Sequence, residues 1–258
     1  MTKKLFLLLP PSEGKQFGGS RVAKVGAFDD ALGPMRREVV AALASSLSNL
    51  TPKQRERTFN ATGPLVERAI AATQRLADGT AATLPSWRRF VGVVWGHLDP
   101  STLDAAQRRR LLIPSSLYGV TTGQDPIADF RLKMNVGVGT LGTTAAYWRP
   151  RVTDVVSAHV RRASVVSLLP KEHEAAIDLT ALRDVCTLVP VTFVDLSSNA
   201  TVGHDAKAVK GILARSLLTE GIEALWHFEW NGWRAEKFDD GMRIIAPAVP
   251  TAGWHNKF

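Results

Sequence analysis

The stretch that decides the fold of this chain is Leu5-Phe6-Leu7-Leu8-Leu9-Pro10-Pro11-Ser12-Glu13-Gly14-Lys15. A continuous apolar run closed by two prolines is typical of a buried strand that ends at the margin of a sheet. The polar residues that follow then form a loop at the carboxyl end of that strand. Open α/β sheets bind ligands at this place. The stretch therefore predicts an α/β sheet with a candidate site at Ser12, Glu13 and Lys15.

Outward from this strand, apolar runs and helical patterns alternate along the chain. Further strands are predicted at residues 90–95, 110–114, 163–169 and 187–196, with 224–230 and 243–246 closing the sheet. Helices are predicted at residues 29–47, 66–76, 144–159 and 205–218, with another that begins at Thr51. Pro150 should kink or split its helix, and Pro190 suits an edge strand or a bulge. The pattern predicts a mixed, twisted sheet with helices packed around it.

The amino-acid composition excludes several classes of protein but says little about the binding partner. The 258 residues are 45% hydrophobic and 22% charged, which excludes a disordered or collagen-like chain. No repeat or long linker divides them, so we expect one domain over residues 1–258, with a helical hairpin at about 50–77. The formal charge of +8 favours polyanionic partners, although an ordinary soluble basic surface explains the same excess.

The sequence also supports predictions about the cellular compartment, membrane contact, metals and cofactors. The apolar run near the amino terminus is too short for a signal peptide and lacks a cleavage site, and no segment has the ~20 apolar residues of a membrane span. We therefore expect a cytoplasmic protein without membrane contact. The single cysteine and the six histidines show no metal-ligand spacing, so neither a metal nor a cofactor is expected.

Four polar clusters stand beside the predicted strands or on the last long helix. They are Ser12, Glu13 and Lys15; Ser116 and Tyr118 with Arg131 and Lys133; Lys171 and Glu172; and Lys207, Lys210 and Arg215. Strand ends project side chains into a common crevice, so we expect a basic cleft at the strand ends. Polar turns, structural ion pairs and a solvated helix face are the alternatives without function.

Several motifs in order along the chain give a resemblance to a known family. They are Pro-Ser-Glu-Gly-Lys after the first strand, Ser116-Leu117-Tyr118-Gly119-Val120, Phe130-Arg131-Leu132-Lys133-Met134, Trp148, Leu168-Leu169-Pro170-Lys171-Glu172, and Ala206-Lys207 through Gly211 to Arg215. Through these motifs, which span nearly the whole chain, the sequence resembles the YaaA peroxide-stress-response family. The resemblance implies a mixed α/β fold with a positively charged cleft, binding of double-stranded DNA, and a role in limiting oxidative damage. It also implies a helix-hairpin-helix-like element, here Thr51 to Leu76.

Two functions stay open from the sequence. The first is a binding protein that holds duplex DNA by its backbone, with Ser12, Glu13, Lys15, Ser116, Arg131, Lys133, Lys210 and Arg215 as DNA- or anion-binding residues. The second is an enzyme that acts on a nucleotide-like or other small anionic substrate in the same cleft. Its catalytic residues would be Lys171, Glu172, Lys207 and Tyr118, because a carboxylate beside a lysine tunes an acid, a base or an amine nucleophile. Neither function implies an obligate protein partner.

Overall fold

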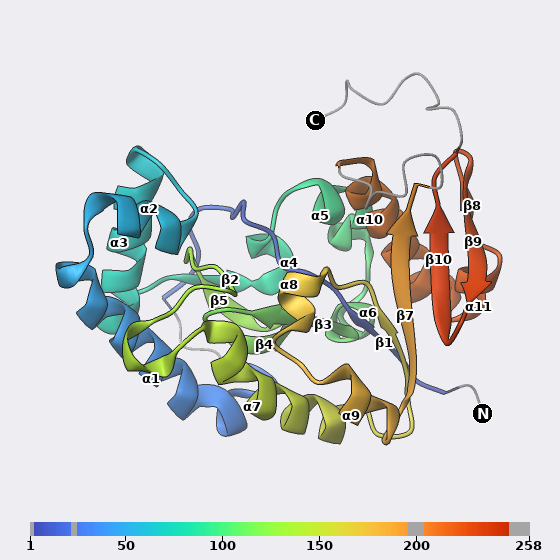
Figure 1. Cartoon of the computed structure of the whole chain (residues 1–258), viewed down its shortest axis with the longest axis horizontal. Coiled ribbons are helices and arrows are strands. Elements are labelled where there is room, and N and C mark those ends of the chain that lie inside the picture. The colour runs from blue at the N-terminus through green and yellow to red at the C-terminus, as the bar shows by residue number, and fades with distance from the viewer. Residues whose placement is uncertain (1–2, 22–24, 196–203, 248–258) are drawn as a thin grey trace.

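A computed structural model describes residues 3–21, 25–195 and 204–247, and the fold is built on one large mixed sheet (Figure 1). Within these residues the sheet has eight strands in the order β4-β3-β1-β6-β7-β10-β9-β8, and β2 pairs with β5 in a separate two-stranded sheet. The strands are β1 (Leu5–Leu8), β2 (Thr83–Pro85), β3 (Leu111–Ser115), β4 (Gly119–Thr122), β5 (Pro126–Ala128), β6 (Ser164–Ser167), β7 (Thr187–Val194), β8 (Glu229–Trp230), β9 (Trp233–Phe238) and β10 (Gly241–Ile245). The predicted mixed α/β class is confirmed.

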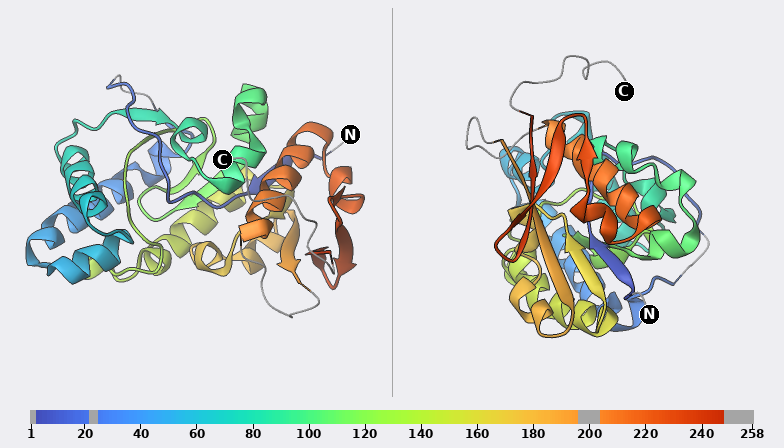
Figure 2. Two further views of the ribbon diagram at one scale, coloured as in Figure 1. Left: turned by 90° about the horizontal axis from the view of Figure 1, so that it is seen from above. Right: turned by 90° about the vertical axis from the view of Figure 1, so that its right-hand side faces the viewer.

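Helices cover both faces of the large sheet (Figure 2). They are α1 (Asp29–Ser46), α2 (Pro52–Phe59), α3 (Pro64–Ala77), α4 (Ser86–Arg89), α5 (Val93–Leu98), α6 (Ala105–Arg109), α7 (Thr144–His159), α8 (Lys171–Glu174), α9 (Leu179–Arg183), α10 (His204–Glu220) and α11 (Glu223–Trp226), with short 3-10 turns at Leu47–Asn49, Pro100–Thr102 and Gly139–Leu141. Helices α10 and α5 pack together on one face, whereas α7 and α9 lie on the other (Figure 2).

The strand that opens the chain lies inside the parallel part of the sheet. β1 pairs in parallel with β3 on one side and with β6 on the other, and every residue of the three strands is buried. Burial on both faces explains why Leu5–Leu8 is apolar throughout rather than alternating. Because the three strands are parallel neighbours, their carboxyl ends meet at one edge of the sheet, as the predicted crevice requires.

The predicted strand at residues 90–95 is wrong. Phe90 forms only an isolated bridge with Lys15, and Val93–Leu98 is helix α5. Gly92, at φ 132°, breaks the extended run at a backbone conformation that favours glycine. Trp95 and Leu98 are three apart and buried, in the spacing of a helix face that packs against α10. An apolar run of this length fits a strand and a buried helix equally well, which is why the pattern misled.

The expectation for Pro190 is also wrong, and so is the expected split at Pro150. β7 is an interior strand that pairs in parallel with β6 and β10, so Pro190 lies neither at an edge nor on an edge strand. The pairing of β7 with β10 begins at Val191 opposite Met242, so Pro190, which has no amide to donate, lies just before that ladder. Pro150 lies inside α7, which is assigned as one helix from Thr144 to His159 and is not split.

The predicted helical hairpin consists of α2 and α3. Thr51 begins α2 with a capping box to Gln54, and Asn60 ends it in the left-handed conformation, at φ 48°. After the turn, Pro64 occupies the first position of α3. The next two amides, of Leu65 and Val66, already donate to the carbonyls of Thr62 and Gly63. The start of α3 therefore holds few free amides of the kind that a helix-hairpin-helix offers to phosphate.

Candidate functional site

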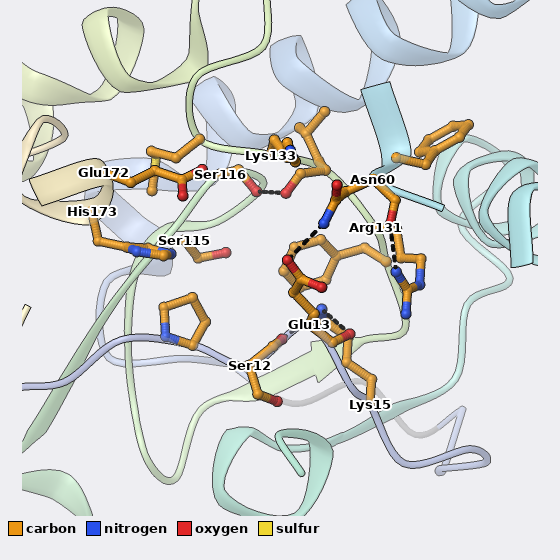
Figure 3. Close-up of a pocket in the computed structure, with 15 residues that line it drawn as sticks. Ser12, Glu13, Lys15, Asn60, Ser115, Ser116, Arg131, Lys133, Glu172 and His173 are labelled. Carbon is orange, nitrogen blue, oxygen red and sulfur yellow. Dashed lines mark hydrogen bonds between the residues drawn. The ribbon is translucent and has the colours of Figure 1, made fainter. Parts of the chain in front are cut away.

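A small pocket lies where β1, β3 and β6 end (Figure 3). Ser12 and Glu13 follow β1, Ser115 and Ser116 end and follow β3, and the pair Glu172 and His173 follows β6. Two further segments close it, namely the end of α2 and residues 130–134, which lie outside the strands. The lining residues are Pro11, Ser12, Glu13, Lys15, Phe59, Asn60, Ser115, Ser116, Phe130, Arg131, Leu132, Lys133, Met134, Glu172 and His173. Residues far apart in sequence thus share one pocket of about 80 Å³.

Lys15 is the most unusual titratable group of the pocket. Its ammonium donates to the carbonyls of Ser12, at 3.0 Å, and Glu13, at 3.4 Å. The Nζ atom lies 4.4 Å from the centroid of the Phe130 ring and 5.7 Å from that of Phe90. Burial lowers the pKa of Lys15 to about 7; the carboxylate of Asp129 opposes this shift. Near neutral pH a large fraction of Lys15 is therefore uncharged amine.

Arg131 and Lys133 come from the segment 130–134 that closes the pocket, and both are half-buried. Arg131 donates from Nη1 to the carbonyl of Asn60, at 3.2 Å. Asn60 in turn donates from Nδ2 to Glu13 Oε1, at 2.7 Å (Figure 3). Asn60, the residue that caps the carboxyl end of α2, thus connects the loop after β1 to residues 130–134. It also holds the Glu13 carboxylate at the pocket.

The turn after β3 explains why serine, glycine and tryptophan occur together in the sequence motifs. Trp148 donates from Nε1 to the carbonyl of Ser116, at 2.8 Å, and its ring packs against Gly119 so closely that a Cβ would come within 2.8 Å of it. Gly119 also has φ 72°, which favours glycine. Ser116 donates to the carbonyl of Leu132, at 2.7 Å. These contacts fix the hydroxyl-bearing strand end against the run that carries the cations.

Tyr118 does not line the pocket. Its hydroxyl accepts a hydrogen bond from the amide of Ala128, at 2.8 Å, and its ring contacts Phe130 with 5.5 Å between centroids. Burial raises the pKa of Tyr118 to about 12. The side chain supports the pocket wall from behind, and its phenol stays protonated at neutral pH.

His173 brings a neutral imidazole to the pocket. Its Nδ1 atom is buried and has no hydrogen-bond partner among the described residues. Burial lowers the pKa of His173 to about 4, and the nearby charge of Lys210 lowers it further. Burial lowers the pKa of Lys210 to about 8, with Glu174 acting in the opposite direction, and its Nζ lies 5.1 Å from the Phe193 ring centroid. Lys210 therefore lies behind α8 and acts on the pocket through His173.

The other predicted cations are placed differently. Lys171 is exposed at the start of α8, next to the pocket residue Glu172, and Lys207 is exposed on α10. Arg215 donates to the carbonyls of Leu98 and Asp99, both at 3.2 Å, and to the hydroxyl of Thr102. It joins α10 to the turn after α5, so the structure does not bring it together with Lys15 or Arg131.

The pocket therefore unites seven of the predicted residues, which come from the first three clusters. They are Ser12, Glu13, Lys15, Ser116, Arg131, Lys133 and Glu172. Asn60 was not predicted as a site residue. Its position shortly before Thr62-Gly63-Pro64 is a recognisable signal for the end of a helix, but nothing in the sequence indicates its contact with Glu13. Ser115 and His173 are sequence neighbours of the predicted residues Ser116 and Glu172, so their positions after strands could have identified them as pocket residues. Chemically, the set offers an amine, hydroxyls, carboxylates and two cations.

Two further features of the described residues concern metal binding and membrane crossing. No group of three or more histidine, cysteine, aspartate or glutamate side chains is arranged there to hold a metal ion. None of the helices in the described ranges combines the length and the apolar character that a membrane crossing needs.

Comparison with known proteins gives one consistent result. The family described as peroxide stress protein YaaA matches residues 5–238. The chain is 30% identical to a UPF0246 protein of Streptomyces coelicolor over 223 residues, which cover 84% of each chain. It is 29% identical to one from Corynebacterium glutamicum over 224 residues, covering 85% of this chain and 87% of the relative. The chain therefore belongs to the peroxide stress protein YaaA family, as its motifs indicated.

Proposed function

We propose that this protein acts in a peroxide-stress response by binding duplex DNA through the sugar–phosphate backbone. Family membership supports the stress-related part of this proposal. The DNA-binding part rests on a set of cations that we call the basic rim, which consists of Arg57, Arg131, Lys133 and Lys171. Arg131 and Lys133 line the pocket, Lys171 precedes the lining residue Glu172, and Arg57 lies in the last turn of α2, whose end lines the pocket.

The observation that supports the proposal is that Arg131 and Lys133 line the pocket at the strand ends, while Arg57 and Lys171 each lie within two residues of a lining residue. Exposed lysine and arginine side chains bind phosphates and release the counterions condensed on DNA. The guanidinium groups also match phosphate in a two-pronged geometry. Glu13 and Glu172 lie in the same pocket, so the cations of the rim, rather than the floor of the pocket, are the proposed phosphate contacts. Contacts to the backbone carry little sequence information, and binding should be nearly independent of sequence.

A second function, an enzyme acting on a small anionic substrate, is favoured by the chemistry of the pocket floor. Phosphate binding does not need the carboxylates, the hydroxyls or the neutral imidazole of His173. A lysine with a pKa of about 7 is also a poor phosphate ligand, because it is largely uncharged near neutral pH. For this second function we propose Lys15 as the amine in place of Lys171 and Lys207, which are both exposed.

The proposed function is tested by fluorescence anisotropy on three labelled 20-base-pair duplexes of unrelated sequence. We expect similar affinities for the three, and Lys171→Ala should weaken all of them by the same factor. The matched control is Arg161→Ala, which removes an exposed cation just before β6, at the opposite end of that strand. Absence of binding at low salt, or equal losses in the two variants, would reject the proposal.

A further inference from the structure

The environment of Lys15 is that of a reactive amine rather than of an ion-pair partner. Within the described residues no carboxylate forms an ion pair with Nζ, and its hydrogen-bond acceptors are two neutral backbone carbonyls. A neutral amine has two N–H groups, which satisfy these two carbonyls and leave the lone pair unused. The third N–H group of an ammonium would have no oxygen acceptor among these contacts, only the face of the Phe130 ring, 4.4 Å from Nζ. The two carbonyl contacts therefore accommodate the deprotonated form, in agreement with the lowered pKa.

The surroundings supply what an amine needs to react with a carbonyl group. Glu13 lines the same pocket, and Asn60 fixes its carboxylate by a hydrogen bond of 2.7 Å. This carboxylate is placed to carry protons between the amine and the departing water. The rings of Phe90 and Phe130 lie beside the amine and give it an apolar surrounding on that side. Arg131 and Lys133 stand on the pocket wall, where they can bind a phosphate attached to the substrate.

The size of the pocket limits the reacting part of the substrate. A volume of about 80 Å³ accepts a small aldehyde-bearing fragment but not a whole nucleotide. A phosphate on that fragment would reach the cations at the mouth. The open-chain form of a phosphorylated deoxyribose meets both conditions, either as a free sugar phosphate or as an abasic position within DNA.

We propose that Lys15 is an amine nucleophile that forms an imine with the aldehyde of a phosphorylated open-chain sugar. The Nζ lone pair attacks the aldehyde carbon, and one of the two amine protons passes by way of Glu13 to the carbonyl oxygen, which gives a carbinolamine. The second amine proton follows the same route to the hydroxyl, which leaves as water while the carbon–nitrogen double bond forms. No oxidant or reductant is consumed. The proposal rests on the proposed function in one respect, since Arg131 and Lys133 of the basic rim bind the phosphate.

The experiment traps the imine on the full-length protein with sodium cyanoborohydride, which reduces it to a stable secondary amine. Two arms offer a duplex with a single abasic site and 2-deoxyribose 5-phosphate, and an intact duplex is the blank. Mass spectrometry of peptides then locates the adduct. We expect it on Lys15 in at least one arm, and the arm that reacts identifies the source of the aldehyde. With the sugar phosphate, the initial rate should rise about tenfold between pH 6 and pH 8 if the amine fraction controls it.

Lys15→Arg keeps a cation at this place but removes the nucleophile, and it should abolish the adduct. Lys53→Arg, an exposed lysine on α2, is the matched control and should react like the parent protein. No adduct in either arm, an adduct that maps to other lysines, or full yield in Lys15→Arg would overturn the proposal. Anisotropy with intact duplex on the same samples separates the two ideas, because trapped sugar phosphate without duplex binding removes only the proposed function.

Discussion

The salt dependence of DNA binding gives the sharpest test of the basic rim. The perturbation is the double variant Arg131→Ala/Lys133→Ala, which removes the two cations that line the pocket itself. Arg131 loses one hydrogen bond, to the carbonyl of Asn60, so the cost in the free energy of unfolding should be about 1 kcal/mol and the variant should fold. Any larger effect on binding then reports on phosphate contacts.

The magnitude follows from the number of phosphates neutralised. Four rim cations give a slope of log affinity against log salt of about −3.6, at about 0.9 per contact. Between 50 and 200 mM salt the parent protein should lose affinity about 150-fold. The double variant keeps two contacts, so its slope should be about −1.8 and its loss about 12-fold.

The assay is fluorescence anisotropy with one 20-base-pair duplex in a potassium chloride series. The control is Arg109→Ala/Arg161→Ala, two exposed arginines that precede β3 and β6 and hence lie away from the strand ends that form the pocket. It changes the formal charge by the same amount, from +8 to +6. The reasoning is refuted if control and test variants show the same slope, because net charge and not the rim would then drive binding.

Three further predictions concern stability and are checked by urea unfolding. Gly211→Ala should lower the free energy of unfolding by about 1–3 kcal/mol, since its Cβ would clash with the Val94 carbonyl where α10 meets α5. Arg89→Met should cost about 3 kcal/mol or more, because this fully buried guanidinium donates to four backbone carbonyls; Arg88→Met, next to it and exposed, should cost little. His173 has a pKa of about 4 in the folded protein, below its ordinary value of 6.5, so it should lower stability as pH falls from about 6.5 toward 4, and His173→Gln should weaken that dependence.

Much of the site was predictable because it follows from one property of parallel sheets. A polar residue directly after a buried strand lies at the carboxyl edge, and neighbouring parallel strands share that edge. The apolar runs at Leu5–Leu9 and 163–169 were clear, so the residues after them were placed correctly. What no run of sequence shows is which strands are neighbours. The order β3-β1-β6 brings three of the four clusters to one pocket.

The fourth cluster shows the limit of this reasoning. Helical spacing correctly puts Lys207 and Lys210 near one another on α10, but it does not say what the helix packs against. Arg215 meets the turn after α5, and that turn exists because Val93–Leu98 is a helix, which the sequence pattern misassigned as a strand. One error in secondary structure thus changed the expected surroundings of a residue more than a hundred positions away.

Asn60 and Lys15 show a different limit, since their roles depend on contacts between segments. Asn60 reaches Glu13 only because the hairpin of α2 and α3 folds back over the loop after β1. The lowered pKa of Lys15 depends on burial next to Phe130, which is 115 positions further along the chain. Composition and spacing identify such residues as polar, whereas their ionisation is set by tertiary packing.

The central claim is that polar residues far apart in the sequence fold into one pocket, and that Lys15 in this pocket is largely uncharged at neutral pH. The most direct measurement is the rate at which an amine-specific reagent modifies Lys15, followed by mass spectrometry from pH 5 to pH 11 with and without duplex DNA. We predict a midpoint near pH 7 for Lys15, and slower modification when duplex covers the pocket. A midpoint near 10.5, the ordinary value for a lysine, together with no protection by duplex, would contradict the account.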